Sequence, residues 1–340
     1  MGGPGHHRSR PERGPAPRRA DHIRVAGPCH RTAVTDPGAE PLRATARTAT
    51  ARTPALVAVA VAAALFGTSG VARGLGPDGL SSMFVASWRT VVGGAGLIAF
   101  TTLRRDRPWA APLRVGWTLL GGVAVVGYQA AFFAAADRVG VGSAAVVTIA
   151  TGPAVAGVID RLAFDRRVSK RWLLGVCVAV PGVVALASGS GGEADPTGWA
   201  FAVLAGVCYP TYGFATQQLV MDRSPTSAIA TVFGAGALLA LPFAIGSSVA
   251  VQDSIRAAPW GTAALVMYLG LASTALAYGL WAIGLRHLSL SDTVAVTLAE
   301  PVAAVVLAAI LLDEALSARS AAAMTVIVGS VYVATARGDR

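Results

Sequence analysis

The 340-residue chain is 54% hydrophobic and only 14% charged, with a mean hydropathy of +0.58. A soluble domain carries about 25% charged residues, so this composition excludes a soluble enzyme of ordinary surface and indicates a membrane protein. The formal net charge is +10, and the sequence contains no asparagine, which excludes N-linked glycosylation.

Residues 1–52 form a basic segment that differs from the rest of the chain. They contain ten arginines and four acidic residues, and so supply +6 of the net charge. The segment is rich in Arg, Pro and Gly and has no apolar periodicity, which is typical of disorder. We predict a disordered basic cytoplasmic tail, or an extension upstream of the true start. No aromatic residue interleaves with the arginines, so nucleic acid is not an expected partner.

Ten apolar stretches follow, each close to the 20 or so residues that a membrane-spanning helix requires. Turn or charge signals separate neighbouring stretches. The predicted spans are 54–72, 82–103, 115–136, 141–161, 172–189, 198–220, 226–247, 259–283, 290–312 and 319–336. The expected fold class is therefore an all-α membrane protein with ten transmembrane helices.

The distribution of basic residues between the loops predicts the orientation of these spans. With the tail placed in the cytoplasm, the inside loops carry twelve basic residues and the outside loops carry four. Cytoplasmic loops carry the excess of Lys and Arg in membrane proteins. We therefore expect a multi-pass protein of the plasma (inner) membrane with both termini cytoplasmic.

An internal repeat aligns two parts of the chain at an offset of 148 residues. It superimposes spans three and four on spans eight and nine without a gap. The matched pairs include Arg138 with Arg286, Pro153 with Pro301, Ser143 with Ser291 and Asp165 with Asp313. We predict five-helix repeats at 53–190 and 191–340. Because five is odd, the second repeat enters the membrane inverted, as in many secondary transporters.

Several motifs in these spans resemble a known family. They are Arg89 in FVASWR of the second span, Glu300-Pro301 in VTLAEPVAAVV, and DEALS, which begins at Asp313. With them, residues 54–336 resemble the EamA-type transporters of the drug/metabolite transporter superfamily. The resemblance implies a secondary transporter that works by alternating access, with export of amino acids or related metabolites as the leading expectation. The first repeat has Gly152-Pro153 where the second has Glu300-Pro301, which disfavours a symmetric two-site mechanism.

Arg89 is one of two charged residues predicted deep inside a span. It lies about eight residues from the outer end of the second span, or roughly 10 Å at 1.5 Å per residue. A charge at the centre of a membrane costs about 2.5–3.5 kcal/mol on insertion scales. Arg89 is therefore expected to anchor a substrate carboxylate or phosphate, or else to form a structural ion pair or extend to the outer interface.

Glu300 is the second such residue, near the middle of the ninth span. Its protonation could couple to conformation, or its charge could bind a substrate cation. The alternative is that it bonds backbone groups freed at a helix break. Pro301 predicts such a break, because a proline cannot donate the helical hydrogen bond. Pro153 is expected to open the matching helix at Ile149.

Other polar side chains within the spans are weaker candidates. Substrate contacts are predicted for Tyr128, Gln129, Tyr278 and Trp281, for each of which packing is the alternative. Asp160 and Arg161 are expected to reach the cytoplasmic interface, and Asp313 and Glu314 to be solvated at an outer helix end.

No catalytic triad, phosphate-binding loop or metal motif occurs in the sequence, so no enzyme activity, cofactor or metal is expected. The predicted partners are a small-molecule substrate, protons and the lipid bilayer, and a homodimer is left open. Two alternatives to a coupled exporter also stay open. They are an uncoupled facilitator or importer, and a membrane scaffold or sensor without transport.

Overall fold

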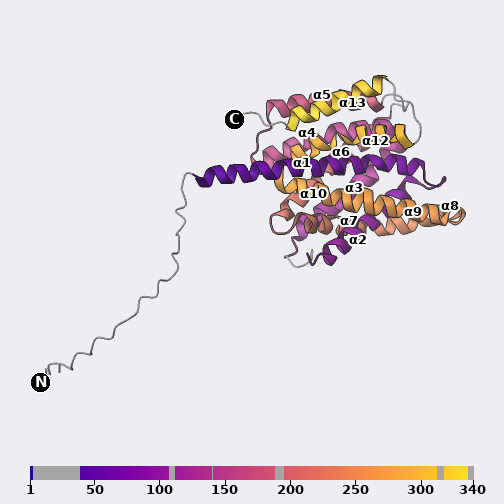
Figure 1. Cartoon of the computed structure of the whole chain (residues 1–340). Helices are drawn as coiled ribbons and strands as arrows, with labels where there is room; N and C mark the ends of the chain where they lie inside the picture. The colour runs from indigo at the N-terminus through magenta and orange to yellow at the C-terminus, as the bar shows by residue number, and fades with distance from the viewer. Residues whose placement is uncertain (3–38, 107–111, 140, 188–194, 312–317, 336–340) are drawn as a thin grey trace, which may run out of the picture. The chain divides into compact units, whose positions relative to one another are not determined.

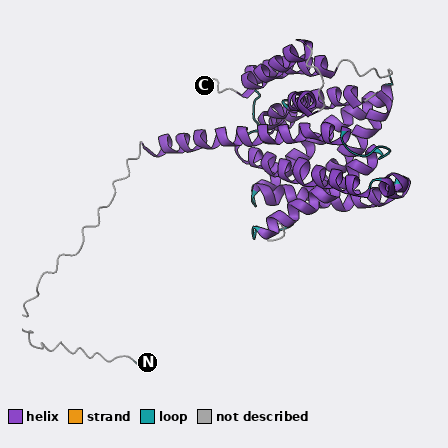
Figure 2. Cartoon of the chain, turned by 45° about the vertical axis from the view of Figure 1, so that its right-hand side comes forward, coloured by secondary structure: helices purple, strands orange, loops and turns teal. Residues whose placement is uncertain are grey.

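The computed structural model describes residues 1–2, 39–106, 112–139, 141–187, 195–311 and 318–335. The chain divides into two units, Met1–Ala44 and Thr45–Arg340, and the second contains the helical bundle. Within the described residues the regular structure is helical, and Figure 2 shows no strand among them. The predicted all-α class is therefore confirmed.

Helices of the first half of the chain follow the predicted spans closely. They are α1 (Ala39–Gly74), α2 (Ser82–Leu103), α3 (Val115–Val139), α4 (Val141–Phe164) and α5 (Lys170–Ala187). α1 begins well before the predicted span at 54, so it includes the end of the stretch that was expected to be disordered. Residues 3–38 of that stretch lie outside the described residues.

The second half of the chain contains more irregular helices. They are α6 (Pro196–Val220), α7 (Pro225–Ala250), α8 (Gln252–Ala257), α9 (Pro259–Gly270), the π-helical segment η1 (Leu271–Leu276), α10 (Ala277–His287), α11 (Leu290–Thr297), α12 (Glu300–Leu311) and α13 (Ala318–Thr335). α9, η1 and α10 follow one another without interruption and occupy the predicted span 259–283. Two residues separate α11 from α12 in the predicted span 290–312.

Seven of the described helical stretches are long enough and apolar enough to cross a membrane. A helix overlaps each of the ten predicted ranges, but α5, α6 and α13 do not meet both criteria. The prediction of ten spans is thus not established by length and composition.

Several helix starts follow from simple capping rules. Ser81, Asp195, Ser224 and Ser289 precede α2, α6, α7 and α11, and each side chain accepts a hydrogen bond from a backbone N–H in the first turn. Proline follows the cap in α6 and α7, where its missing N–H costs nothing. These short signals explain why the boundaries of these helices agree with the sequence-based prediction.

Helices distant in sequence pack together in the bundle. α3 packs against α6 and α7, and α2 packs against α7 and α9. α5 and α13 lie side by side, as Figure 1 also shows, and α4 contacts both α6 and α11. Helices of the two predicted repeats are therefore neighbours throughout the bundle.

Aromatic and aliphatic side chains fill the centre of the bundle, whereas apolar side chains also cover much of its outside. Trp281 and Tyr212 are at most 1% exposed and belong to the largest buried cluster. Leu162, Leu238 and Tyr332 are each more than 70% exposed. Large apolar side chains in such numbers on the outside are expected where lipid, and not water, is the neighbour.

Candidate substrate and coupling site

Arg89 lies where α2 meets the π-helical segment η1. Its Nε donates a hydrogen bond to Oγ1 of Thr274 at 3.4 Å, and that hydroxyl donates at 2.8 Å to the carbonyl oxygen of Leu269, five residues earlier. Thr274 is only 2% exposed. In the described part of the chain, no carboxylate lies within 4.0 Å of the Arg89 guanidinium. The guanidinium is therefore positioned without a bonded counter-ion.

Glu300 lies at an interruption of its helix. α11 ends at Thr297 and α12 begins at Glu300, so the break falls at Leu298 and Ala299, directly before Glu300-Pro301. The amides of these two residues donate to carbonyls three residues earlier, and those of Val302 and Ala303 donate to the carbonyl of Ala299. The break therefore keeps these backbone groups hydrogen-bonded, as the interior of a membrane requires.

Arg89 and Glu300 come from different predicted repeats, and the structure brings them into the same region. The carboxyl of Glu300 and the guanidinium of Arg89 interact electrostatically, although they are too far apart for a direct ion pair. The phenol groups of Tyr128 and Tyr278 also lie within the electrostatic range of both charges. A separated pair of opposite charges can accept a small molecule that carries both a carboxylate and an amine.

Tyr278 and Trp281 belong to a packed group of aromatic rings beside these charges. The hydroxyls of Tyr212 and Tyr278 are hydrogen-bonded at 2.8 Å, and the ring centroids of Tyr128 and Tyr212 are 6.3 Å apart. Trp281 also donates from Nε1 to the hydroxyl of Thr297 at 3.4 Å, beside the helix break. Three of the predicted contact residues, Tyr128, Tyr278 and Trp281, thus converge on one place.

Gln129 points elsewhere. Its side-chain amide donates to the hydroxyl of Thr90 at 3.2 Å. With Met83 and Phe243 it lines a separate cavity of about 40 Å³. A cavity of that size holds only a few water molecules. None of Tyr128, Tyr278 and Trp281 lines it, so Gln129 faces a space apart from the aromatic group.

The two prolines of the internal repeat have different effects. α4 continues as one helix from Val141 to Phe164 through Pro153, whereas Pro301 follows a two-residue interruption. Pro153 was expected to open the helix at Ile149, but α4 is not interrupted there. The ring of Tyr209 lies close to Gly152, where an added Cβ would be 3.1 Å from Cδ1.

Small polar residues of this region were not anticipated from the sequence. Thr274 holds Arg89, and the hydroxyls of Ser69 and Ser273 lie 2.5 Å apart, joining α1 to η1. The only sequence signal is the dipeptide Ser273-Thr274 in an otherwise apolar run. η1 itself is a π-helix, a rare form that is frequent at functional sites.

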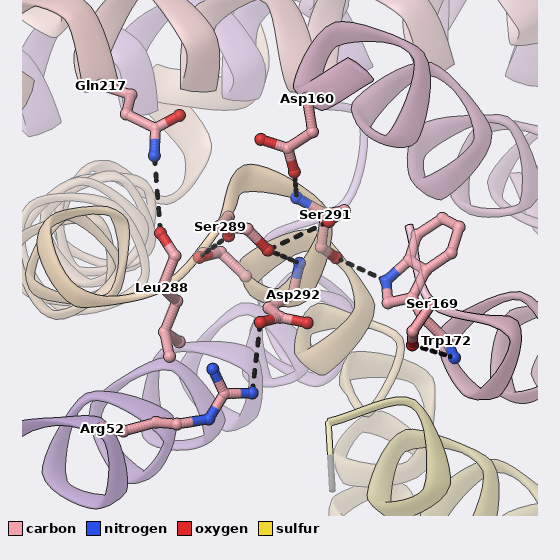
Figure 3. A network of polar contacts seen from close by, with 10 residues as sticks. Arg52, Asp160, Ser169, Trp172, Gln217, Leu288, Ser289, Ser291 and Asp292 are labelled. Atoms are coloured by element: carbon pink, nitrogen blue, oxygen red, sulfur yellow. Dashed lines mark hydrogen bonds and ion pairs between the residues drawn. The ribbon is translucent and has the colours of Figure 1, made fainter. Parts of the chain in front are cut away.

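Asp160 is the clearest correction to the sequence analysis. It was expected at the cytoplasmic interface, but the structure buries it to 1% exposure. Its Oδ2 accepts a hydrogen bond from the backbone N–H of Ser291 at 2.7 Å, as Figure 3 shows. Arg161, by contrast, is exposed and pairs with Asp165. Asp313 and Glu314 lie outside the described residues.

A groove of about 740 Å³ opens between α1, α9 and α12. It lies near the ends of these helices that are predicted to be outside. Most of its lining is apolar, and none of the predicted site residues contributes to it. The lining residues are Thr68, Val71, Ala72, Leu75, Gly76, Pro77, Ala258, Gly261, Ala264, Leu265, Tyr268, Leu307 and Leu311.

Apolar helices of spanning length around a half-buried Arg and Glu, with a broken helix beside them, define a multi-pass membrane transporter. The chain matches the EamA-like transporter family over residues 53–188 and again over 196–336. It therefore belongs to the EamA-like transporter family, whose members are transporters and not enzymes. The two matches also support duplicated halves.

Three curated proteins are similar to the chain over much of its length. The uncharacterized transporter YwfM of Bacillus subtilis (strain 168) is 28% identical over 266 residues, which cover 77% of this chain and 87% of YwfM. A "Probable terminal-alkyne amino-acid exporter" of Streptantibioticus cattleyicolor is 28% identical, with 67% and 73% covered. A "Probable amino-acid metabolite efflux pump" of Salmonella typhimurium is 26% identical, with 50% and 59% covered.

A solved crystal structure supports the fold independently. It superimposes with a TM-score of 0.71 over 84% of this chain and 97% of its own, at 22% sequence identity. At that identity the likeness concerns the fold alone.

Proposed function

We propose that the chain is a secondary transporter that exports amino acids or related metabolites by alternating access. Ten spans in two inverted five-helix repeats, with both termini in the cytoplasm, form the proposed topology. Two relatives whose names refer to amino-acid export support this substrate class. The observation that carries the proposal is the juxtaposition of Arg89 and Glu300, which are half-buried in the bundle and not directly paired.

In this proposal Arg89 and Glu300 bind different groups. Arg89, held by Thr274, binds the carboxylate of the substrate, and guanidinium groups suit planar carboxylates well. Glu300 binds either a proton or the substrate amine, so proton entry releases the amine. The rings of Tyr128, Tyr278 and Trp281 accommodate the apolar part of the substrate. A pH gradient would then drive export in exchange for protons.

Reconstituted protein tests this coupling. A thermal-shift screen against a metabolite library first identifies a ligand, and its flux is then measured in proteoliposomes with and without a pH gradient. We expect the gradient to drive accumulation in the parent protein and in Asp253→Asn, a control at an exposed carboxylate. Glu300→Gln, which cannot release a proton, should lose gradient-driven accumulation but keep downhill flux.

Three results would change the proposal in different ways. Full gradient-driven accumulation by Glu300→Gln contradicts the proton role of that residue. Flux that follows only the substrate gradient in the parent protein indicates a facilitator. If no ligand of the screen is carried, while a stoichiometric partner protein is recovered, a scaffold or sensor is indicated instead.

A further inference from the structure

A polar network, drawn in Figure 3, surrounds the start of α11. The sequence predicts the cytoplasmic side there, whereas the groove lies near the opposite ends of its helices. Its centre is the segment Ser289–Asp292 of the second repeat, which comprises the N-cap and the first turn of α11. Asp160 of α4, in the first repeat, accepts the backbone N–H of Ser291 at 2.7 Å. This hydrogen bond joins the two repeats through a carboxylate that is almost completely buried.

Two more contacts attach the same segment to α5 of the first repeat and to α1, one residue before the predicted start of that repeat. The indole Nε1 of Trp172, on α5, donates to the carbonyl oxygen of Ser291 at 3.2 Å. Arg52, on α1, forms an ion pair with Asp292 at 3.2 Å. Three helices of the first repeat therefore converge on one short turn of the second repeat.

The environment of Asp160 indicates that its bond to Ser291 carries much of this attachment. Its second oxygen, Oδ1, has no hydrogen-bond partner in the described part of the chain and lies 3.6 Å from the half-exposed Arg166. A buried carboxylate is costly unless it is paired. The N–H of Ser291 lies in the first turn of α11, where the helix dipole favours a negative charge.

We propose that Asp160, Trp172 and Arg52 form a latch with Ser289–Asp292 that closes the cytoplasmic side of the transport path. The inference rests on the proposed alternating-access function. The latch is closed in this structure, and the groove lies toward the other side of the membrane. For the path to open inward, α11 must separate from α4 and α5, and these contacts must break.

The helix break gives such a movement a place to bend. α11 has eight residues and ends at Thr297, just before the break and Glu300. When the latch releases, α11 can tilt while α12 keeps its place against α1. The latch at one end of α11 and the coupling residue beyond its other end are thereby connected through about two turns of rigid helix.

Thiol labelling tests the latch without a transport substrate. Val294, one turn beyond the latch, is 1% exposed and faces Gly152 of α4. The reporter Val294→Cys is placed in a protein in which Cys29, Cys177 and Cys208 are replaced by serine. A membrane-impermeant methanethiosulfonate reagent is applied to the cytoplasmic face of inside-out vesicles. The labelling rate then reports how often α11 separates from α4.

Asp160→Ala should raise this labelling rate by about tenfold or more, because a hydrogen bond to a charged group is lost. Asp160→Asn keeps an acceptor oxygen and should give a smaller increase. Trp172→Phe keeps an aromatic ring but removes the indole N–H donor, and should also raise the labelling rate. The matched control Asp222→Ala removes an exposed carboxylate that pairs with Arg114 on the same side, and should leave the rate unchanged.

The latch is overturned if Asp160→Asn and Trp172→Phe, as monodisperse folded proteins, label at the parent rate. If Asp160→Ala fails to fold, the labelling rates of Asp160→Asn and Trp172→Phe alone test the latch. An equal increase in the Asp222→Ala control would also overturn it, because the effect would then be general loosening. Labelling requires no flux, so failure of the latch is distinct from failure of the proposed transport function.

Discussion

At the scale of single residues, Thr274 explains how a guanidinium is held inside the bundle without an adjacent carboxylate. Its hydroxyl accepts from Arg89 and donates to the carbonyl of Leu269. Both roles need an oxygen at that place, and the methyl group of threonine packs against Gly93 of α2. The side chain is thus a positioning residue that acts through Arg89.

Thr274→Val should weaken ligand binding by about tenfold, because a hydrogen bond to a charged donor is worth about 1.5–3 kcal/mol. Thr274→Ser keeps the oxygen and should bind nearly as well as the parent protein. Titration by thermal shift, with the ligand found in the screen, measures both dissociation constants. Equal binding by the valine and serine variants would show that Arg89 needs no such support.

At the scale of helices, the close contact between α1 and α12 fixes the position of the break. A Cβ added to Gly67 would lie 2.7 Å from the carbonyl oxygen of Glu300 and 2.8 Å from the backbone nitrogen of Ala304. Neither atom belongs to a flexible side chain. Only glycine lets the two helices approach this closely.

Gly67→Ala should therefore lower the free energy of unfolding by about 1–3 kcal/mol through overpacking. Gly70, one turn along the same helix, provides a matched control because an added Cβ meets nothing within 4 Å. Gly70→Ala should be neutral or stabilise by about 0.5–1 kcal/mol. Thermal unfolding in detergent compares the two. Equal midpoints would contradict the close contact of α1 with α12.

At the scale of the whole molecule, the proposed orientation in the membrane is inferred from the distribution of charge. The loop between α4 and α5 is strongly basic, and the short α8 lies between spans seven and eight of the predicted topology. Arg167, in the loop between α4 and α5, and Gln252, at the start of α8, are both exposed and so suit labelling at these two positions. The positive-inside rule puts the first in the cytoplasm and the second outside.

An impermeant thiol reagent should label Gln252→Cys in intact cells, and should label Arg167→Cys only after permeabilisation. Both variants are made in a protein without native cysteines. The reverse pattern would invert the whole topology. Labelling of both sites from the same side would mean that the number of spans between them is even, and would contradict the proposed count.

Sequence reasoning identified the features that depend on local chemistry. Arg89 and Glu300 stand out as charges in apolar runs, and Pro301 marks the break because a proline lacks the helical donor. The contrast with Pro153 shows the limit of that rule, since α4 continues as a helix around it. Whether a proline interrupts a helix depends on neighbours that the sequence does not specify.

The parts that escaped prediction depend on tertiary contacts. Thr274 resembles any other threonine in a span until α2 is packed against it, and η1 has no sequence signature of its own. Asp160 lies near a predicted helix end, where solvent was the natural expectation. Its burial arises from α11, which is more than a hundred residues away in the sequence.

The π-helical segment η1 has a consequence for the face that α10 presents to the site. A wider turn carries an additional residue, so every residue beyond it is rotated, by about 100° in an α-helix, relative to an uninterrupted helix. Tyr278 and Trp281 lie just beyond η1, whereas Leu265 and Leu269 lie before it. Loss of a single residue from Leu271–Leu276 would leave a longer, more regular helix and turn both rings away from the charges. A change in substrate preference could thus arise by deletion of one residue, without the exchange of any side chain that touches the substrate.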